Sequence, residues 1–209
     1  MANNLATLSS KLATALRDTA HTTWNSTEKD DLVTWAVASL YPRYVRSIDP
    51  TTTTIPLVSS TYFYALPTGV VEISNIDLYN ATTEYGPLNG QAWQIAGDIY
   101  AGTGKLRLAP SFANTGDTLR LHGYGIYDTT TNLIPDRLVP LISAKARSEA
   151  YRRMAGDRAR YEKWATTNQK QNVSVNELIL LINEADNEAL RLDHVSGVTR
   201  RLPVPGRLA

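Results

Sequence analysis

Three histidines and no cysteine are available for metal or nucleophilic chemistry. His21, His122 and His194 lie in separate segments, so no pair has the i, i+4 spacing of a helical zinc site. Without cysteine there is no thiolate ligand, no cysteine nucleophile and no disulfide. No GxSxG-type motif supports a serine triad. We therefore interpret the three histidines as structural or surface residues, and we expect no metal and no cofactor.

A glycine-rich stretch, Gly102-Thr103-Gly104-Lys105, superficially resembles a phosphate-binding loop. That motif requires GxxxxGK followed by Ser or Thr and then a helix. Here Leu106-Arg107-Leu108 follows, and its alternation of apolar and charged residues is typical of a strand. We therefore interpret the stretch as a hairpin turn.

Carboxylates are scattered through the middle of the chain. Glu72, Asp77, Glu84 and Asp98 leave a glycosidase-like pair open, although solvated strand and loop positions are the favoured interpretation. No catalytic constellation emerges from these residues, and we predict that the protein is not an enzyme.

Tyrosines are unusually frequent, with eleven Tyr against two Phe. Tyrosine combines apolar area with a polar tip, which suits half-buried surfaces and interfaces. Ordinary β propensity and a subunit interface explain the enrichment best, and a carbohydrate-binding module is the alternative. Seven tyrosines fall in the middle segment: Tyr62, Tyr64, Tyr79, Tyr85, Tyr100, Tyr124 and Tyr127.

Length and composition limit the class of protein. The chain has 209 residues, of which 43% are hydrophobic and 20% charged, which is typical of one globular domain or two small ones. The net charge of +1 argues against a uniformly basic nucleic-acid-binding surface. No run approaches 18 apolar residues, and the first residues lack the pattern of a signal peptide, so we expect neither a membrane span nor a secretory leader.

Helical periodicity marks the first 50 residues. Leucines at three- and four-residue spacing predict an amphipathic helix over residues 5–16. A second helix carries Leu32, Trp35 and Leu40, and Ser26 or Thr27 suits its N-cap. Two apolar stripes this close together predict an antiparallel helix pair.

The middle of the chain has the pattern of strands. Short apolar runs separated by Gly- and Asn-containing turns predict an antiparallel unit of about five to seven strands over residues 51–134. The alternation slips at Ser74-Asn75, which indicates a β-bulge. The expected strands lie at residues 55–58, 62–66, 71–78, 93–96, 99–100, 105–108 and 118–124.

Helical periodicity returns after Ile134-Pro135. One long element is predicted over residues 137–166, with a possible break at Gly156, and another from Ser174 to Leu192. The fold class is therefore α+β, a helical bundle with an inserted antiparallel β unit and an extended C-terminal tail. The predicted parts are residues 1–50 with 135–193 as one helical domain, 51–134 as the β unit, and 194–209 as the tail.

Charge is segregated along the chain although its sum is small. Residues 137–170 hold nine basic and three acidic groups, whereas residues 171–193 hold one basic and five acidic groups. A solvated helix face would explain this pattern. Alternatively, the basic face of one copy meets the acidic face of another, an arrangement that closes into rings. The candidate inter-subunit residues are Arg147, Arg152, Arg153, Arg158 and Arg160.

The C-terminal tail is basic and punctuated by apolar residues. It is either a frayed terminus or a segment that orders on a partner or a neighbouring subunit. For the second interpretation the candidate binding residues are Arg200, Arg201, Leu202, Val204, Arg207 and Leu208.

The order of these features resembles the head-to-tail adaptor proteins of tailed bacteriophages, also called head-completion or gatekeeper proteins, including the tail tubular protein A type. The likeness begins with an amphipathic helix followed by a Trp-bearing helix. In the β unit it includes a Leu-Pro pair before a strand, a Gly-Pro-Leu stretch, a Trp strand and a Gly-Tyr strand end. An Ile-Pro then opens a long helix rich in Ala, Arg and Tyr. Beyond the two helices, the likeness is carried by Leu66-Pro67, Gly86-Pro87-Leu88, Trp93, Gly123-Tyr124, Ile134-Pro135 and Ala144 to Trp164.

This resemblance implies a structural protein of the virion, assembled in the host cytoplasm. Family members form a dodecameric ring in the neck, between the portal protein and the tail or nozzle proteins. The ring extends the DNA channel without sequence-specific binding, and family C-terminal segments reach into the portal or across a neighbouring subunit. The resemblance therefore gives the segregated charge and the basic tail a common purpose.

Overall fold

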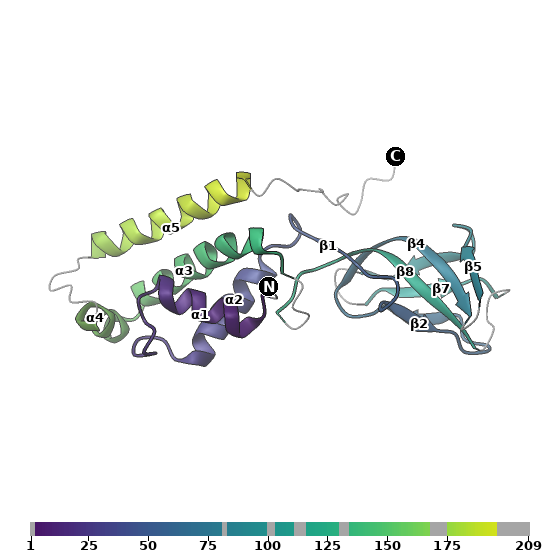
Figure 1. Cartoon of the computed structure of the whole chain (residues 1–209), viewed down its shortest axis with the longest axis horizontal. Coiled ribbons are helices and arrows are strands. Elements are labelled where there is room, and N and C mark those ends of the chain that lie inside the picture. Colours follow the sequence, from purple (N-terminus) through teal and green to yellow (C-terminus); the bar gives the residue numbers. More distant parts are fainter. Residues whose placement is uncertain are drawn as a thin grey trace. The chain divides into compact units, whose positions relative to one another are not determined.

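The structure is a computed structural model that describes residues 3–80, 83–99, 103–110, 116–129, 134–167 and 175–195. The chain divides into two compact units (Figure 1). One comprises Met1–Tyr44 and Tyr127–Ala209, and the other comprises Val45–Ile126. Helices form the first unit and antiparallel strands the second. The α+β fold class predicted from the sequence is confirmed.

The N-terminal part of the helical unit is a pair of helices, α1 (Leu5–Ala15) and α2 (Ser26–Ala38). The N-cap of α2 predicted at Ser26 or Thr27 is wrong. Asn25 is the N-cap, because its side chain accepts a hydrogen bond from the N–H of Glu28 while the Glu28 carboxylate accepts one from the N–H of Asn25. This reciprocal capping box satisfies two N–H groups that a helix start otherwise leaves unpaired.

The break at Gly156 that the sequence allowed in the long element over residues 137–166 is present, so two helices occupy this stretch. The first helix ends at Gly156, and Asp157 caps the next by accepting a hydrogen bond from the N–H of Arg160 at 3.1 Å. No helix within the described ranges is both long and apolar enough to cross a membrane. The elements are a short 3₁₀ turn η2 (Asp136–Leu138), α3 (Val139–Ala155), α4 (Arg158–Thr167) and α5 (Val175–Val195).

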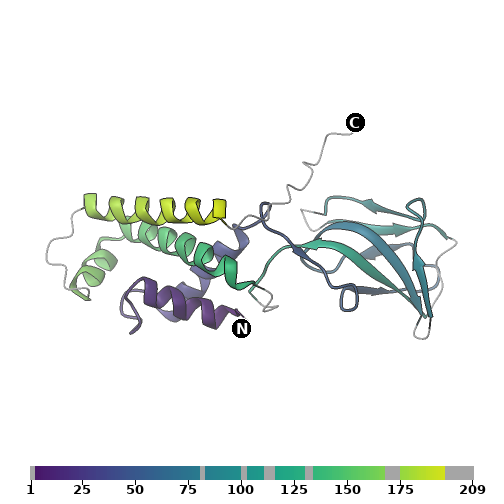
Figure 2. The ribbon, with the colours of Figure 1, turned by 45° about the horizontal axis from the view of Figure 1, so that its top comes forward.

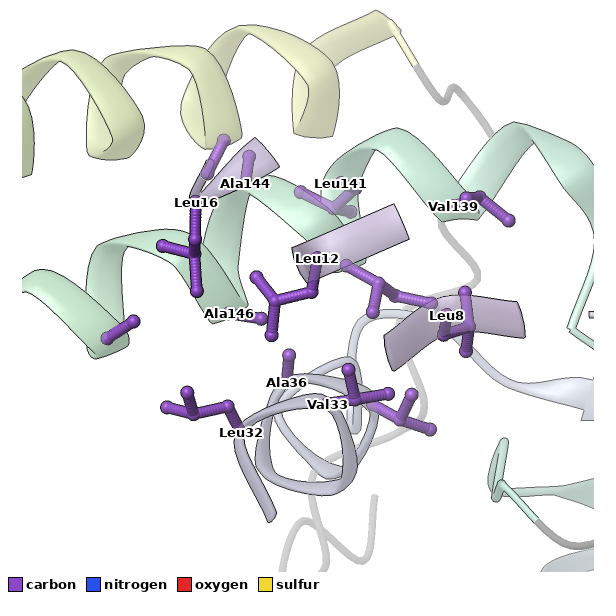
Figure 3. Packing of buried hydrophobic residues seen from close by; sticks show 14 of the residues in the cluster. Leu8, Leu12, Leu16, Leu32, Val33, Ala36, Val139, Leu141, Ala144 and Ala146 are labelled. Carbon is purple, nitrogen blue, oxygen red and sulfur yellow. The ribbon is translucent and has the colours of Figure 1, made fainter. Parts of the chain in front are cut away.

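Helix α3 is the centre of the helical unit. It packs against α1, α2, α4 and α5, and it runs between α5 and the α1–α2 pair (Figure 2). Small residues such as Ala146 and Ala150 are completely buried on α3, which lets neighbouring helices approach closely. Figure 3 shows the leucines of α1 pointing into this core beside α2 and α3. The α1 stripe predicted from the sequence is buried at Leu8, Leu12 and Leu16.

The β unit contains two antiparallel sheets. A five-stranded sheet has the order β1-β8-β4-β5, with β2 also paired to β8, and a three-stranded sheet has the order β3-β7-β6. Buried side chains of both sheets belong to one core, among them Leu106, Leu119 and Leu121. The strands are β1 (Arg46–Ser47), β2 (Thr54–Pro56), β3 (Phe63–Ala65), β4 (Val70–Asn80), β5 (Thr83–Pro87), β6 (Trp93–Ala96), β7 (Lys105–Leu108) and β8 (Asp117–Gly125).

The irregularity predicted at Ser74-Asn75 is present. The register between β4 and β8 shifts between Ile73 and Asn75, as a bulge requires. The strand predicted at residues 99–100 is wrong at Ile99, which lies in a turn, and Tyr100 lies outside the described residues. Lys105 begins strand β7, so the glycine-rich stretch does not lead into a helix.

Candidate functional site

The basic helix surface predicted to contact other subunits is carried by α3 and α4. Arg147, Arg152 and Arg153 lie on α3, and Arg158 and Arg160 lie on α4. Each of these guanidinium groups forms an ion pair with a carboxylate of the same chain.

Helix α5 supplies the acidic partners of α3. Arg147 pairs with Glu188, and Arg152 pairs with Asp186 at 2.6 Å. The buried Ser148 hydroxyl, between these two arginines in sequence, donates a hydrogen bond to the other oxygen of Asp186 at 2.6 Å. The basic and acidic blocks recognised in the sequence therefore meet inside one chain and align α5 along α3.

The remaining arginines have local or N-terminal partners. Arg153 and Arg158 pair with the glutamates four residues away on their own helices, Glu149 and Glu162. Such exposed pairs contribute only about 0.3–0.5 kcal/mol. Arg160 reaches Glu28 of α2 at 2.6 Å, which ties α4 to the N-terminal helices.

These contacts explain the segregated charge without a second subunit, and the inter-subunit role of the five arginines stays a prediction. Of the set, Arg158 is the most accessible, because its side chain is 91% exposed. The predicted tail residues Arg200, Arg201, Leu202, Val204, Arg207 and Leu208 lie outside the described residues.

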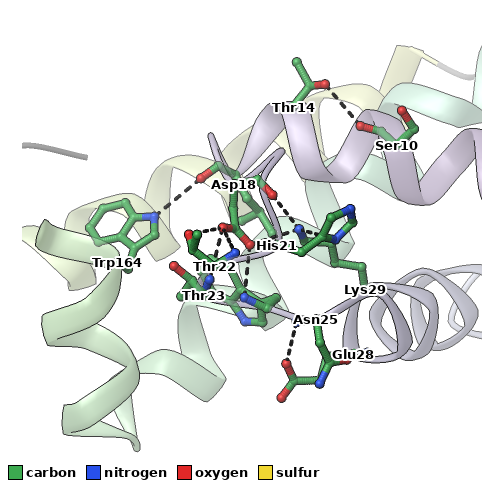
Figure 4. A network of polar contacts seen from close by, with 12 residues as sticks. Ser10, Thr14, Asp18, His21, Thr22, Thr23, Asn25, Glu28, Lys29 and Trp164 are labelled. Carbon is green, nitrogen blue, oxygen red and sulfur yellow. Dashed lines mark hydrogen bonds and ion pairs between the residues drawn. The ribbon is translucent and has the colours of Figure 1, made fainter. Parts of the chain in front are cut away.

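A buried ion pair organises the connection between α1 and α2. Asp18 and Lys29 are both inaccessible, and the Lys29 ammonium lies 2.9 Å from the Asp18 carboxylate. Lys29 also donates a hydrogen bond to the Asp18 backbone carbonyl and lies 3.1 Å from Nδ1 of His21. Figure 4 shows the polar groups converging on Asp18.

The Asp18 carboxylate also holds the backbone of the connection. It accepts hydrogen bonds from the N–H groups of Thr22, Thr23 and Trp24 at 2.8–3.1 Å. Burial alone would raise the pKa of Asp18. The hydrogen bonds from Trp24, Lys29 and the two threonines outweigh burial and lower that pKa to about 2.

This lowered pKa predicts acid sensitivity. An unfolded aspartate titrates near 3.9, so between about pH 4 and pH 2 the unfolded state binds more protons at this position than the folded state does. The contribution of Asp18, about 2 kcal/mol, should be complete above pH 5 and lost as the pH falls through 4 to 2. Urea unfolding of the wild type and of Asp18→Asn from pH 6 to pH 2 measures it. A stability difference that stays constant over this range would contradict the prediction.

In the described part of the chain, no group of three or more histidine and carboxylate side chains could hold a metal ion. His122 lies 2.5 Å from Asp77, whose other carboxylate oxygen accepts a hydrogen bond from Asn75, and His21 lies against Lys29. The side chain of Glu84 is not among those that the structure describes.

The tyrosines of the β unit differ in how far they are exposed to solvent. Tyr64 is buried, and its hydroxyl bonds to the backbone of Val58 and Thr61. Arg120 stacks over the Tyr79 ring at 3.7 Å. Among the described tyrosines of this unit only Tyr62 is classed as exposed. Tyr127 is buried in the helical unit, and the side chains of Tyr85 and Tyr100 are outside the described ones.

Sequence reasoning missed three residues with unusual surroundings. Lys29 is buried although its neighbours in sequence are acidic and polar, and Lys145 is a partly buried amine on α3. Trp35 was assigned to an apolar stripe, yet its side chain is 40% exposed. Their neighbours in the sequence could not have revealed this, because the groups that surround them lie elsewhere in the chain.

Comparisons with known proteins give one family. A family model described as SU10 adaptor protein matches residues 3–189 of the chain. The match spans the whole β unit and most of the helical unit, and it ends within α5. No curated protein matches the chain.

Proposed function

The chain belongs to the SU10 adaptor protein family, a family of phage head-to-tail adaptors, and from this membership we propose that it forms a ring between the portal and the tail. As a structural phage adaptor it is a component of the virion that interacts with other head and tail proteins. The proposed ring is dodecameric, lies in the neck, extends the DNA channel without reading sequence, and assembles in the host cytoplasm. Membership of a structural adaptor family supports a structural role rather than an enzymatic one.

The family match carries this proposal, and the architecture supports it. A helical unit built on α3 offers long rigid surfaces, and a separate β unit offers a second body with its own core. We propose that the helical unit forms the body of the ring and contacts the portal, while the β unit faces the tail or nozzle proteins and neighbouring subunits. Residues 194–209 would act as a separate basic segment that binds the portal or a neighbour.

Mixing the protein with the purified portal of the same phage tests the proposal. Native mass spectrometry should detect a multi-subunit complex, and electron microscopy should show an added ring coaxial with the portal. Removal of residues 196–209 should weaken this complex, because the three arginines of the predicted tail are lost. If the full-length protein forms no complex with the portal, the adaptor proposal is wrong. If the truncated protein binds as well as the full chain, only the role of the tail is lost.

Charge reversal at Arg158 separates subunit contacts from folding. Its side chain is 91% exposed and pairs only within α4 among the ion pairs of the described residues, so Arg158→Glu should change the free energy of unfolding by no more than about 0.5 kcal/mol. If α4 contacts an acidic surface of the next subunit, the same change should weaken ring assembly. Urea unfolding and native mass spectrometry with the portal give the two readouts.

A second test of the same set is Arg153→Glu, because Arg153 also has an i, i+4 partner on its own helix but is less exposed, at 41%. Normal assembly by both variants would contradict an inter-subunit role for this helix surface.

A further inference from the structure

A groove runs over α3 between α2 and α5. Trp35 of α2 and Leu190 of α5 stand at its sides, and Lys145 and Ser148 of α3 contribute to its lining. Its volume is about 490 Å³, which is within the range of ligand pockets in proteins. We call this feature the α3 groove.

Both sides of the α3 groove carry exposed apolar surface. The side chain of Trp35 is 40% exposed and that of Leu190 is 58% exposed. An exposed tryptophan beside an exposed leucine is the composition of a protein contact, because aromatic anchors dominate binding energy at interfaces. The apolar part of an occupant would therefore lie between these two residues.

Lys145 gives the α3 groove a polar anchor. Its ammonium donates hydrogen bonds to the backbone carbonyl and the hydroxyl of Ser39, at 3.1 and 3.2 Å. Within the described residues Lys145 has no ion pair. Burial lowers the pKa of Lys145, with Arg43 acting in the same direction and Asp193 opposing them. An ammonium that is desolvated without a bound carboxylate gains when an anion binds.

The charges around the α3 groove determine the sign of its occupant. The two carboxylates, Asp186 and Asp193, are already paired with Arg152 and Arg43. The lining itself holds two cations, Lys145 and Arg152, and these two carboxylates. Because Asp193 pairs with Arg43 from outside the lining, Lys145 is the cation of the lining that has no ion pair within the described residues. The predicted tail of this chain carries three arginines and no acidic side chain, so it has the wrong sign.

We propose that the α3 groove binds a peptide segment of a partner protein that carries an apolar side chain next to a carboxylate. The apolar side chain lies between Trp35 and Leu190, and the carboxylate pairs with Lys145. The proposal rests on the proposed function only for the source of that segment, which would be another protein of the virion.

An array of overlapping peptides from the other structural proteins of the virion tests this. The probe set includes each acidic peptide together with a version in which Asp and Glu are replaced by Asn and Gln. Wild-type protein should bind a subset of acidic, apolar peptides and lose binding to their amide versions. Leu190→Ser and Lys145→Met should each weaken binding about tenfold or more. Leu180→Ser is the matched control, because Leu180 is 59% exposed on the same helix and outside the groove lining.

Three outcomes would overturn the inference. These are no binding to any acidic peptide, equal binding by Leu190→Ser and the wild type, or selective binding of a peptide of residues 196–209, which would assign the groove to the tail. Because Leu190 is exposed, Leu190→Ser should fold even if Lys145→Met does not. Portal binding by the wild type is measured in parallel. A complex that forms without any peptide binding refutes the groove alone, whereas failure of the wild type to bind the portal refutes the adaptor function.

Discussion

Replacing Asp18 with alanine is expected to lower the free energy of unfolding by about 3–5 kcal/mol. The change leaves the Lys29 ammonium completely buried without its carboxylate partner. Breaking one half of a buried pair costs far more than the pair itself contributes, because an uncompensated charge stays in a low-dielectric interior.

The loss extends beyond the ion pair. The same carboxylate accepts the N–H groups of Thr22, Thr23 and Trp24, and Trp24 is completely buried in the helical core. The connection that positions α1 against α2 would therefore lose its polar anchor. We expect the effect to appear in all elements that pack on the α1–α2 pair.

Urea unfolding at pH 7 measures this prediction, with Asp31→Ala as control, because Asp31 is exposed and close by on α2. The control should change stability by less than about 0.5 kcal/mol. The double variant Asp18→Ala, Lys29→Met should recover part of the loss, since it removes the unpaired charge. A loss below about 1 kcal/mol in Asp18→Ala would show that the pair is not buried in solution.

The contrast between Leu12 and Lys29 shows how far the sequence could predict this core. Leu12 belongs to a stripe with helical spacing, and local periodicity alone predicts its burial. Lys29 follows Glu28 and precedes Asp30 and Asp31, which is typical of a solvated helix start. Its burial depends on Asp18, eleven residues earlier, in a connection whose path no local pattern specifies.

The basic helix surface of α3 and α4 could also be predicted only in part from the sequence. The sequence could show that one helical segment is basic and the next acidic, because composition is local. It could not show that Arg147 and Arg152 meet Glu188 and Asp186 of the same chain, because that depends on which helices are neighbours. The two sheets of the β unit were not predicted for the same reason, whereas the bulge was predicted because a slip in alternation is visible in the sequence.

The bulge leads to the second large expected effect, in Gly123→Ala. Gly123 lies on β8 opposite Ile73, next to the register shift, with φ of +157°. A Cβ atom at this position would lie 1.9 Å from the backbone carbonyl oxygen of Glu72. Because the obstacle is backbone of the paired strand, no side-chain rotation can relieve the contact, and β4 and β8 must separate locally. Strain and overpacking together should cost about 3–5 kcal/mol.

This glycine belongs to the Gly-Tyr strand end in the resemblance to phage adaptors, and the bulge supplies a physical reason for it. Gly90→Ala is the matched control, because a Cβ atom there would meet nothing within 4 Å. Hydrogen exchange followed by mass spectrometry should show lost protection in residues 117–125 of Gly123→Ala, while residues 139–155 of α3 keep theirs, since α3 belongs to the other unit with its own core. Equal protection of β8 in both glycine variants would mean that the bulge tolerates a side chain and that the close approach of Glu72 is not required for the fold.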